Sequence, residues 1–121
     1  MPTKRLPVDA VEHKKKYRRN KDFFTKGVDK NEYPNWYVTA IFFSVYHMIC
    51  AYYYKIGETI PRSGQDLRII DDLRGIKSEI QFLEKKVRIV LYGGLDVKAR
   101  DIGDAKDIFE VVESCMLKKI S

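Results

Sequence analysis

The sequence predicts an all-α protein, an up-down antiparallel bundle of four long helices and one short helix within a single domain, residues 1–121. From Trp36 to Tyr54 the chain holds no Asp, Glu, Lys or Arg, although a third of all residues are charged. The segments on either side repeat apolar residues at alternating spacings of three and four, the period of an amphipathic helix. No segment alternates with the period of two expected of a strand. At 121 residues the chain is long enough to enclose one hydrophobic core.

The uncharged stretch is expected to form the central helix. Either Pro34 occupies its first turn or Asn35 caps its N-terminus, and Gly57 ends it. Because apolar side chains cover nearly every face, other helices should surround it. A transmembrane span is the rival interpretation, but Thr39, Ser44, His47 and five tyrosines require partners that lipid does not offer. We therefore expect no membrane association.

The first helix is expected to run from Pro7 or Val8 to Gly27 and to turn back against the central helix through a short polar connection. Phe23 should widen its apolar stripe. The members of that stripe are Leu6, Ala10, His13, Tyr17, Asn20 and Phe24.

Beyond Gly57, Ser63 with Asp66 three residues later is similar to a capping box and predicts a short helix that ends near Gly75. A longer helix should follow from Ile76 to Gly93 and Gly94. The last helix should begin near Asp101 and Asp104, because carboxylates favour a helix N-terminus. It should end near Lys118 and Lys119, where cations are favourable.

The formal net charge of +6 belongs entirely to the N-terminal segment. Residues 1–30 hold ten Lys or Arg and four Asp or Glu, and the remaining residues hold thirteen of each. The two cysteines, Cys50 and Cys115, lie at apolar helical positions as small hydrophobic residues in a reducing compartment. The N-terminus lacks the apolar run of a secretory signal, so we expect a cytoplasmic protein.

No group of residues forms a known catalytic site. Neither His13 nor His47 has a second metal ligand three or four residues away, and neither cysteine belongs to a CxxC pair. A phosphate-binding GxxxxGK[ST] loop and a GxSxG nucleophile elbow are also missing from the sequence. We therefore expect no metal and no cofactor.

Three groups of residues remain as binding candidates. His47 is either a buried, hydrogen-bonded histidine or a polar group that lines a cleft between helices. Arg88 and Tyr92 lie four residues apart and so share a helix face, with a buried tyrosine as the alternative. The basic run either binds phosphates or is only a solvated helix face, and Tyr17 within it belongs to the buried stripe. The run comprises Lys14, Lys15, Lys16, Arg18, Arg19 and Lys21.

Several segments together resemble the HEPN-domain family. The stretch YPNWYVTAIFFSVYHMICAYYY resembles the second helix of that family, and PRSGQDLRIIDDL is similar to the loop and short helix that follow it. RIVLYGGLD resembles the end of the fourth helix, and DIGDAKDIFEVVESC resembles the last one. The resemblance covers residues 8–118, and the order and spacing of the pieces carry most of it.

The resemblance implies a helical bundle that pairs into a homodimer with a shared cleft. Many HEPN proteins are metal-independent ribonucleases, often toxins of toxin–antitoxin modules, and others bind nucleotides or RNA or pair with small nucleotidyltransferases. The cutting members carry an Arg and a His separated by four to six residues. Here Arg88 is followed by Tyr92, and no histidine comes after His47. The ribonuclease signature is therefore absent.

We accordingly expect a non-catalytic HEPN-like protein that binds nucleotides or RNA. Its ligand-binding candidates are His47, Arg62, Arg88 and Tyr92. One alternative is a divergent metal-independent ribonuclease that uses His47, and another is a structural partner of a nucleotidyltransferase.

Overall fold

The computed structural model describes residues 5–58, 70–93 and 96–120, with the side chains of residues 5–9 and 92 excepted. Every regular element in these ranges is helical, which confirms the prediction of an all-α protein. The elements are α1 (Arg5–Asp22), η2 (Phe23–Gly27), α2 (Pro34–Ile56), η3 (Asp71–Ile76), α3 (Lys77–Arg88), η4 (Ile89–Gly93) and α4 (Ala99–Ile120).

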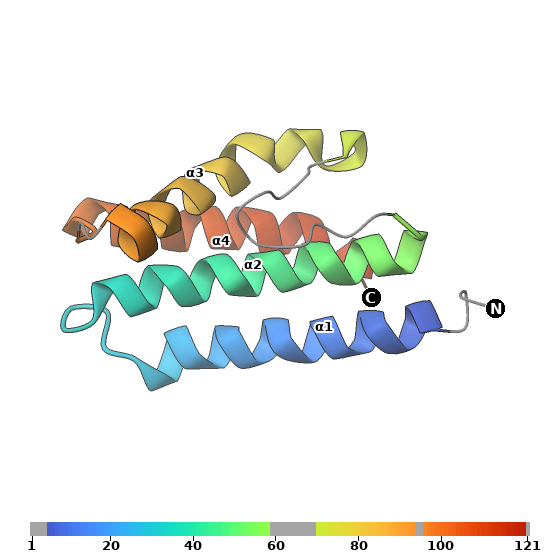
Figure 1. Cartoon of the computed structure of the whole chain (residues 1–121), viewed down its shortest axis with the longest axis horizontal. Helices are drawn as coiled ribbons and strands as arrows, with labels where there is room; N and C mark the ends of the chain where they lie inside the picture. Colours follow the sequence, from blue (N-terminus) through green and yellow to red (C-terminus); the bar gives the residue numbers. More distant parts are fainter. Residues whose placement is uncertain (1–4, 59–69, 94–95, 121) are drawn as a thin grey trace.

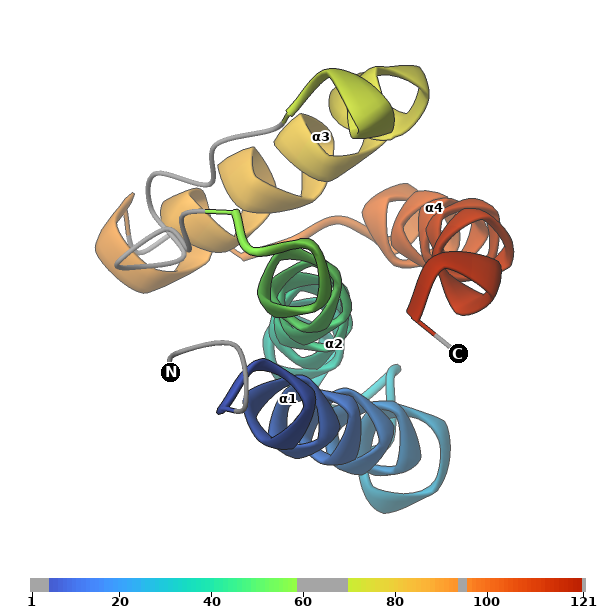
Figure 2. The same ribbon diagram turned by 90° about the vertical axis from the view of Figure 1, so that its right-hand side faces the viewer.

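Helix α2 lies at the centre of the molecule, as its apolar sequence predicts. In the end-on view of Figure 2, α1 packs on one side of α2, while α3 and α4 pack on the other. Helices α1 and α2 are antiparallel and joined by a short turn, and the end of α3 and the start of α4 lie near this turn (Figure 1). We call this region the turn end of the bundle.

The core is built from the inward faces of all four helices. Fully enclosed side chains of α2 include Ile41, Val45 and Ile49, and they belong to one cluster with Leu83 of α3 and Val112 of α4. Burying one such side chain stabilises the fold by about 1.5–3 kcal/mol. Each flanking helix contributes one stripe to this core, whereas α2 contributes nearly its whole circumference, which explains the absence of charges from α2.

The two ends of α2 show which capping prediction holds. Pro34 occupies the first turn, where its missing N–H has no partner to lose, and Tyr33 precedes it without a side-chain cap. The prediction that Asn35 is the cap is wrong, because Asn35 lies inside the helix. Its side-chain amide bridges to the segment before α4, accepting from Val97 N (3.0 Å) and donating to Asp96 (3.0 Å). Gly57 ends the helix as predicted, in the left-handed conformation (φ 75°).

Helix α1 ends in a π-helical turn, η2, which no sequence pattern predicted. The turn closes at Gly27, the predicted end, while α1 begins at Arg5, a few residues before the predicted start. The expectation that Phe23 widens the buried stripe is wrong: its side chain is 43% exposed. Tyr17 and Phe24 of that stripe are buried as predicted.

The later helices depart from the predictions mainly at their ends. Ser63, Asp66 and the start of the predicted short helix lie outside the described residues, and its later part is the 3₁₀ turn η3. Helix α3 ends in a second π-helical turn, η4. Helix α4 begins at Ala99, before Asp101. No helix in the described ranges is long and apolar enough to cross a membrane.

The Asp101 carboxylate fixes the start of α4. It accepts a hydrogen bond from Lys98 N (3.1 Å) and pairs with Lys86 of α3 (3.3 Å). Burial alone raises the pKa of this carboxyl, but the Lys98 backbone and the Lys86 ammonium more than offset it, so the pKa lies below its usual value. Asp101 thus stabilises the helix terminus and ties α4 to α3.

Candidate nucleic-acid interface

The predicted basic run winds around α1 rather than forming one face. Lys15 pairs with Glu12 of its own helix (3.4 Å), and Lys21 pairs with Glu113 of α4 (2.7 Å). The remaining members form no ion pair with any carboxylate among the described side chains; they are Lys14, Lys16, Arg18 and Arg19. Four of the six predicted cations are therefore available to an anionic ligand.

Tyr17, within the basic run, is occupied by the fold. Its hydroxyl donates a short hydrogen bond to Glu113, which also holds Lys21. Burial and then the Glu113 hydrogen bond raise the pKa of this phenol, so it remains a neutral donor. Ser44 of α2 donates to the backbone carbonyl of Tyr17 (2.9 Å). Tyr17 therefore joins three helices and has no face free for stacking a base.

Exposed aromatic side chains lie next to the basic run, at the turn end of the bundle. Phe23, Tyr33 and Trp36 are 43%, 50% and 62% exposed. Together with Gly27 and Val28 they line a shallow pocket of about 350 Å³. We call Phe23, Tyr33 and Trp36 the aromatic patch. Contiguous exposed apolar surface of this kind marks binding sites on folded domains.

Trp36 lies between two hollows. Besides the pocket of the aromatic patch, it lines a second hollow of about 510 Å³ together with Asn35, Asp96 and Val97. The Asn35 bridge to residues 96 and 97 forms the wall of this second hollow. A planar ligand that stacks on Trp36 can therefore extend into either hollow.

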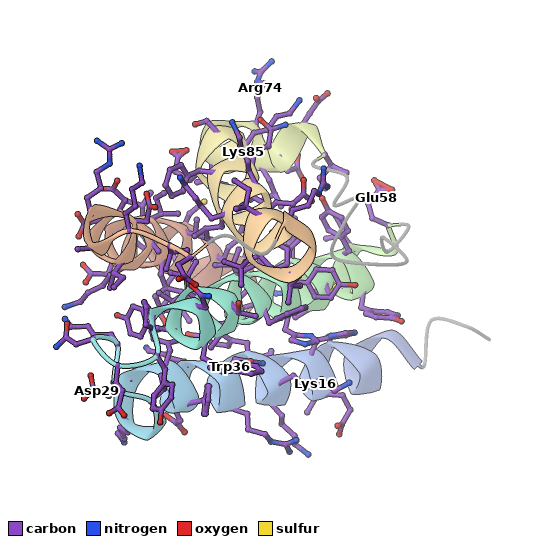
Figure 3. The ribbon with its side chains drawn as sticks, turned by 60° about the vertical axis from the view of Figure 1, so that its left-hand side comes forward. Lys16, Asp29, Trp36, Glu58, Arg74 and Lys85 are labelled. Atoms are coloured by element: carbon purple, nitrogen blue, oxygen red, sulfur yellow. The ribbon has the colours of Figure 1, made fainter. Side chains whose placement is uncertain are left out.

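Cations flank the aromatic patch. Lys16, Arg19 and Phe23 follow one another at spacings of three and four, so they share one stripe of α1, and Lys26 lies in η2, the same π-helical turn as Phe23. All three cations are exposed. Figure 3 shows Lys16 and Trp36 on the same side of the molecule, while Arg74 and Lys85 lie on the opposite side. The patch and the cations Lys16, Arg19 and Lys26 form one surface, which we call the basic–aromatic surface.

The two histidines of the chain meet across the α1–α2 interface. The Nδ1 atoms of His13 and His47 lie 2.8 Å apart, and their rings stack with centroids 5.1 Å apart. Tyr54, two turns further along α2, stacks on His13 as well (5.3 Å). His47 is therefore a half-buried histidine of the α1–α2 interface whose hydrogen-bond partner is the His13 imidazole.

His47 is uncharged at neutral pH. Burial, followed by His13 and the Lys16 ammonium, lowers its pKa to about 4. One turn later, burial raises the pKa of the Cys50 thiol to about 11. Cys50 is thus a buried, inert thiol. In the part of the chain that the structure describes, no three His, Cys, Asp or Glu side chains are arranged to hold a metal ion.

Of the other predicted ligand-binding residues, the structure describes the side chain of Arg88, and this side chain does not lie beside His47. Arg88 pairs with Glu84 one turn earlier on α3 (3.5 Å) and lies towards the turn end of the bundle, whereas His47 lies near the middle of α2. The π-helical turn that follows Arg88 changes the spacing on which the predicted Arg88–Tyr92 face was based. Arg62 and the side chain of Tyr92 lie outside the described residues.

The histidine pair and the aromatic patch were not anticipated from the sequence. A signal existed for the pair: His13 and His47 each lie 17 positions from residue 30, the middle of the turn, so antiparallel helices bring them to the same height. Phe24 and Tyr37, which lie six and seven positions from residue 30, also come together (5.7 Å between rings). No comparable signal marked the patch, because Phe23 and Trp36 both lie in apolar runs that predict burial.

Comparison of the chain with protein-family models, curated proteins and solved structures found no match. Its function is therefore inferred from the chemistry of the surface.

Proposed function

We propose that this chain is a non-catalytic, HEPN-like binding protein that holds single-stranded RNA on its basic–aromatic surface. The observation that carries the proposal is the aromatic patch, three exposed rings around one pocket, beside Lys16, Arg19 and Lys26. Single-strand binders combine these two elements: aromatic rings on which bases stack, and cations that follow the phosphate backbone.

The two elements contribute in different ways. Stacking of one base on an aromatic side chain stabilises a complex by about 1–3 kcal/mol and tolerates any sequence. The cations act by releasing counterions from the phosphates, so their contribution falls steeply with salt. A duplex would present its bases only at groove edges, whereas a single strand can lay a base flat on Trp36. The surface therefore favours single strands.

Fluorescence anisotropy with a labelled single-stranded RNA tests the proposal. We expect Trp36→Ala to weaken binding about 5- to 150-fold, the equivalent of one lost stacking interaction. Replacing Lys16, Arg19 and Lys26 by Gln should flatten the plot of log affinity against log salt by about two units, at about 0.7 per phosphate neutralised. The matched control replaces three exposed cations of η3 and α3 by Gln and should leave the slope unchanged; they are Arg74, Lys77 and Lys85.

Equal slopes in the two triple variants would show that the effect is one of net charge alone and would refute the proposed surface. Absence of binding by the wild type at about 50 mM salt would refute RNA binding altogether. Both variants change exposed side chains, for which the free energy of unfolding usually changes by less than about 0.5 kcal/mol.

The histidine pair supports a second candidate function, a metal-independent ribonuclease. Two adjacent imidazoles can serve as acid and base in proton transfer. We favour binding without cleavage, because the pair lies in the packed interface between α1 and α2 and the Arg–His signature is missing. Cleavage of RNA in the presence of a chelator, lost in a folded His47→Gln variant, would establish the ribonuclease instead.

A further inference from the structure

A groove of about 540 Å³ lies at the turn end of the bundle, between α1, the turn and α4. Its floor consists of Phe24, Tyr37 and Phe109, one ring from each of three elements. Phe24 packs edge-to-face against both other rings, at 5.7 Å from Tyr37 and 4.9 Å from Phe109. The volume lies within the range of sites that bind small molecules, about 300–1,000 Å³.

Tyr37 supplies an unused polar group in this groove. Its side chain is only 5% exposed, and its hydroxyl forms no hydrogen bond with any residue that the structure describes. Every fully enclosed polar side-chain atom among the described residues has a partner, so the unpaired hydroxyl is the part of Tyr37 that reaches the groove surface. Burial and then the Glu110 carboxylate raise the pKa of this phenol, so it stays a neutral hydroxyl that a ligand can engage.

The rim of the groove offers further unused groups. Glu110 lies close enough to Tyr37 to influence its ionisation, and it forms no ion pair with a described residue. Lys30 of the turn and Lys106 of α4 are likewise exposed cations on the rim without a described partner. In contrast, Glu113 is engaged by Tyr17 and Lys21. Asp29 also lines the groove, but its carboxylate accepts from the backbone of Asn31 and Glu32 in the turn. The Tyr37 hydroxyl, the Glu110 carboxylate and two cations are therefore available around the groove.

We propose that this groove binds a guanine base. The Tyr37 hydroxyl donates to O6, the two oxygens of Glu110 accept from N1–H and the N2 amino group, and Lys30 and Lys106 attract the attached phosphate. Guanine is the RNA base whose Watson–Crick edge presents one acceptor followed by two donors. Adenine and cytosine present one donor group beside a bare ring nitrogen, which would face the carboxylate. Uracil has a single donor between two acceptors, so one oxygen of Glu110 would face an acceptor instead of a donor.

The guanine site rests in part on the proposed RNA binding and would add a base-specific contact to it. The groove and the aromatic patch are adjacent, because Val28 lines both. The guanine can come from a free nucleotide or from a guanosine within a strand whose neighbouring base stacks on Trp36. Both sources share the recognition by Tyr37 and Glu110 and differ in their dependence on the aromatic patch.

Calorimetric titration of the full chain with mononucleotides tests the inference. GMP should bind at least about tenfold more tightly than AMP, CMP or UMP, since hydrogen bonds to a charged group contribute about 1.5–3 kcal/mol. IMP, which lacks the N2 amino group, should bind about tenfold more weakly than GMP. Glu110→Gln should abolish the preference for GMP, and Tyr37→Phe should weaken GMP binding several-fold. Glu12→Gln, the same change at an exposed site of α1 outside the groove, is the matched control.

The two proposals fail separately. Equal affinity for GMP and AMP, or an unchanged preference in Glu110→Gln, would overturn the guanine site even if RNA binds. If Trp36→Ala loses RNA binding but keeps GMP binding, the guanine in the groove can come from a strand that the aromatic patch holds. If the wild type binds GMP but no RNA, the groove takes a free nucleotide and the proposed function is refuted. Should Tyr37→Phe fail to fold, the exposed Glu110 variant decides the outcome.

Discussion

The two ends of α2 carry similar aromatic residues and use them differently. The C-terminal end holds Tyr52, Tyr53 and Tyr54, and the N-terminal end holds Trp36 and Tyr37. At the C-terminal end Tyr52 donates to Asp72 (2.8 Å), and the Tyr53 hydroxyl accepts from Ile70 N (3.2 Å). Tyr52 and Tyr53 thereby hold η3 and the residue before it against the core.

At the N-terminal end the same types of side chain have no such partners among the residues that the structure describes. The Trp36 indole is mostly exposed, and the Tyr37 hydroxyl, on an otherwise buried ring, donates to no described residue. Polar groups that the fold itself satisfies contribute to stability, and those that it leaves at a groove surface are available to a ligand. The contrast therefore separates a structural end of α2 from a binding end.

The largest expected difference between the two ends concerns stability. Tyr53 is completely buried, so Tyr53→Ala should lower the free energy of unfolding by about 3–5 kcal/mol through the cavity that it leaves. Trp36→Ala should change it by less than about 0.5 kcal/mol, because the indole is exposed. Urea denaturation of both variants measures the difference. Comparable losses in the two variants would mean that both ends are structural.

A smaller effect is expected at the histidine pair, between the two ends. The pKa of His47 is about 4 in the fold against 6.5 in the unfolded chain, so the unfolded chain takes up the proton first. The stability that this histidine contributes is complete above about pH 6.5 and is lost as the pH falls towards 4. We expect a loss of about 1–3 kcal/mol over this range, which His47→Gln should remove. Thermal unfolding of wild type and variant at several pH values measures it; parallel curves for the two would contradict the assignment.

The smallest expected effects on the free energy of unfolding come from removing the hydroxyl of one tyrosine at each end of α2. Tyr52→Phe should lower the free energy of unfolding by about 1 kcal/mol, because the hydrogen bond to Asp72 is lost. Tyr37→Phe should leave it unchanged or raise it slightly, since its hydroxyl serves no described residue. Differential scanning calorimetry resolves changes of this size. A loss at Tyr37 equal to that at Tyr52 would show that the Tyr37 hydroxyl serves the fold.

Sequence alone predicted the positions of the helices because the governing signals are local. The uncharged run defines α2, Gly57 ends it, and the stripe through Tyr17 and Phe24 defines the inner face of α1. Hydrophobic periodicity is the most direct record of such structure in a sequence. The class of fold could therefore be predicted, whereas the start of α4 and the role of Asn35 required knowledge of which segments meet.

The candidate site was far less predictable. Phe23 and Trp36 lie in apolar runs and are chemically suited to the core, so periodicity assigns them to it. They are exposed because the aromatic patch lies on a part of the α1–α2 pair that α3 and α4 leave uncovered, which is a property of the whole bundle. The unused hydroxyl of Tyr37 is likewise visible only once every neighbour has been placed.

Helices α1 and α3 both end in π-helical turns, η2 and η4, at the turn end of the bundle. A π-helical turn contains one residue more than the α-helical turn in the same place, and such turns are frequent at functional sites. Removal of any one residue from Phe23–Gly27 would restore a regular helix and rotate the chain beyond it by about 100°. Gly27 and Val28 would then face away from Trp36. The length of this segment therefore matters as much as the side chains that it carries, so chains that share the surface should conserve the spacing between Tyr17 and Trp36.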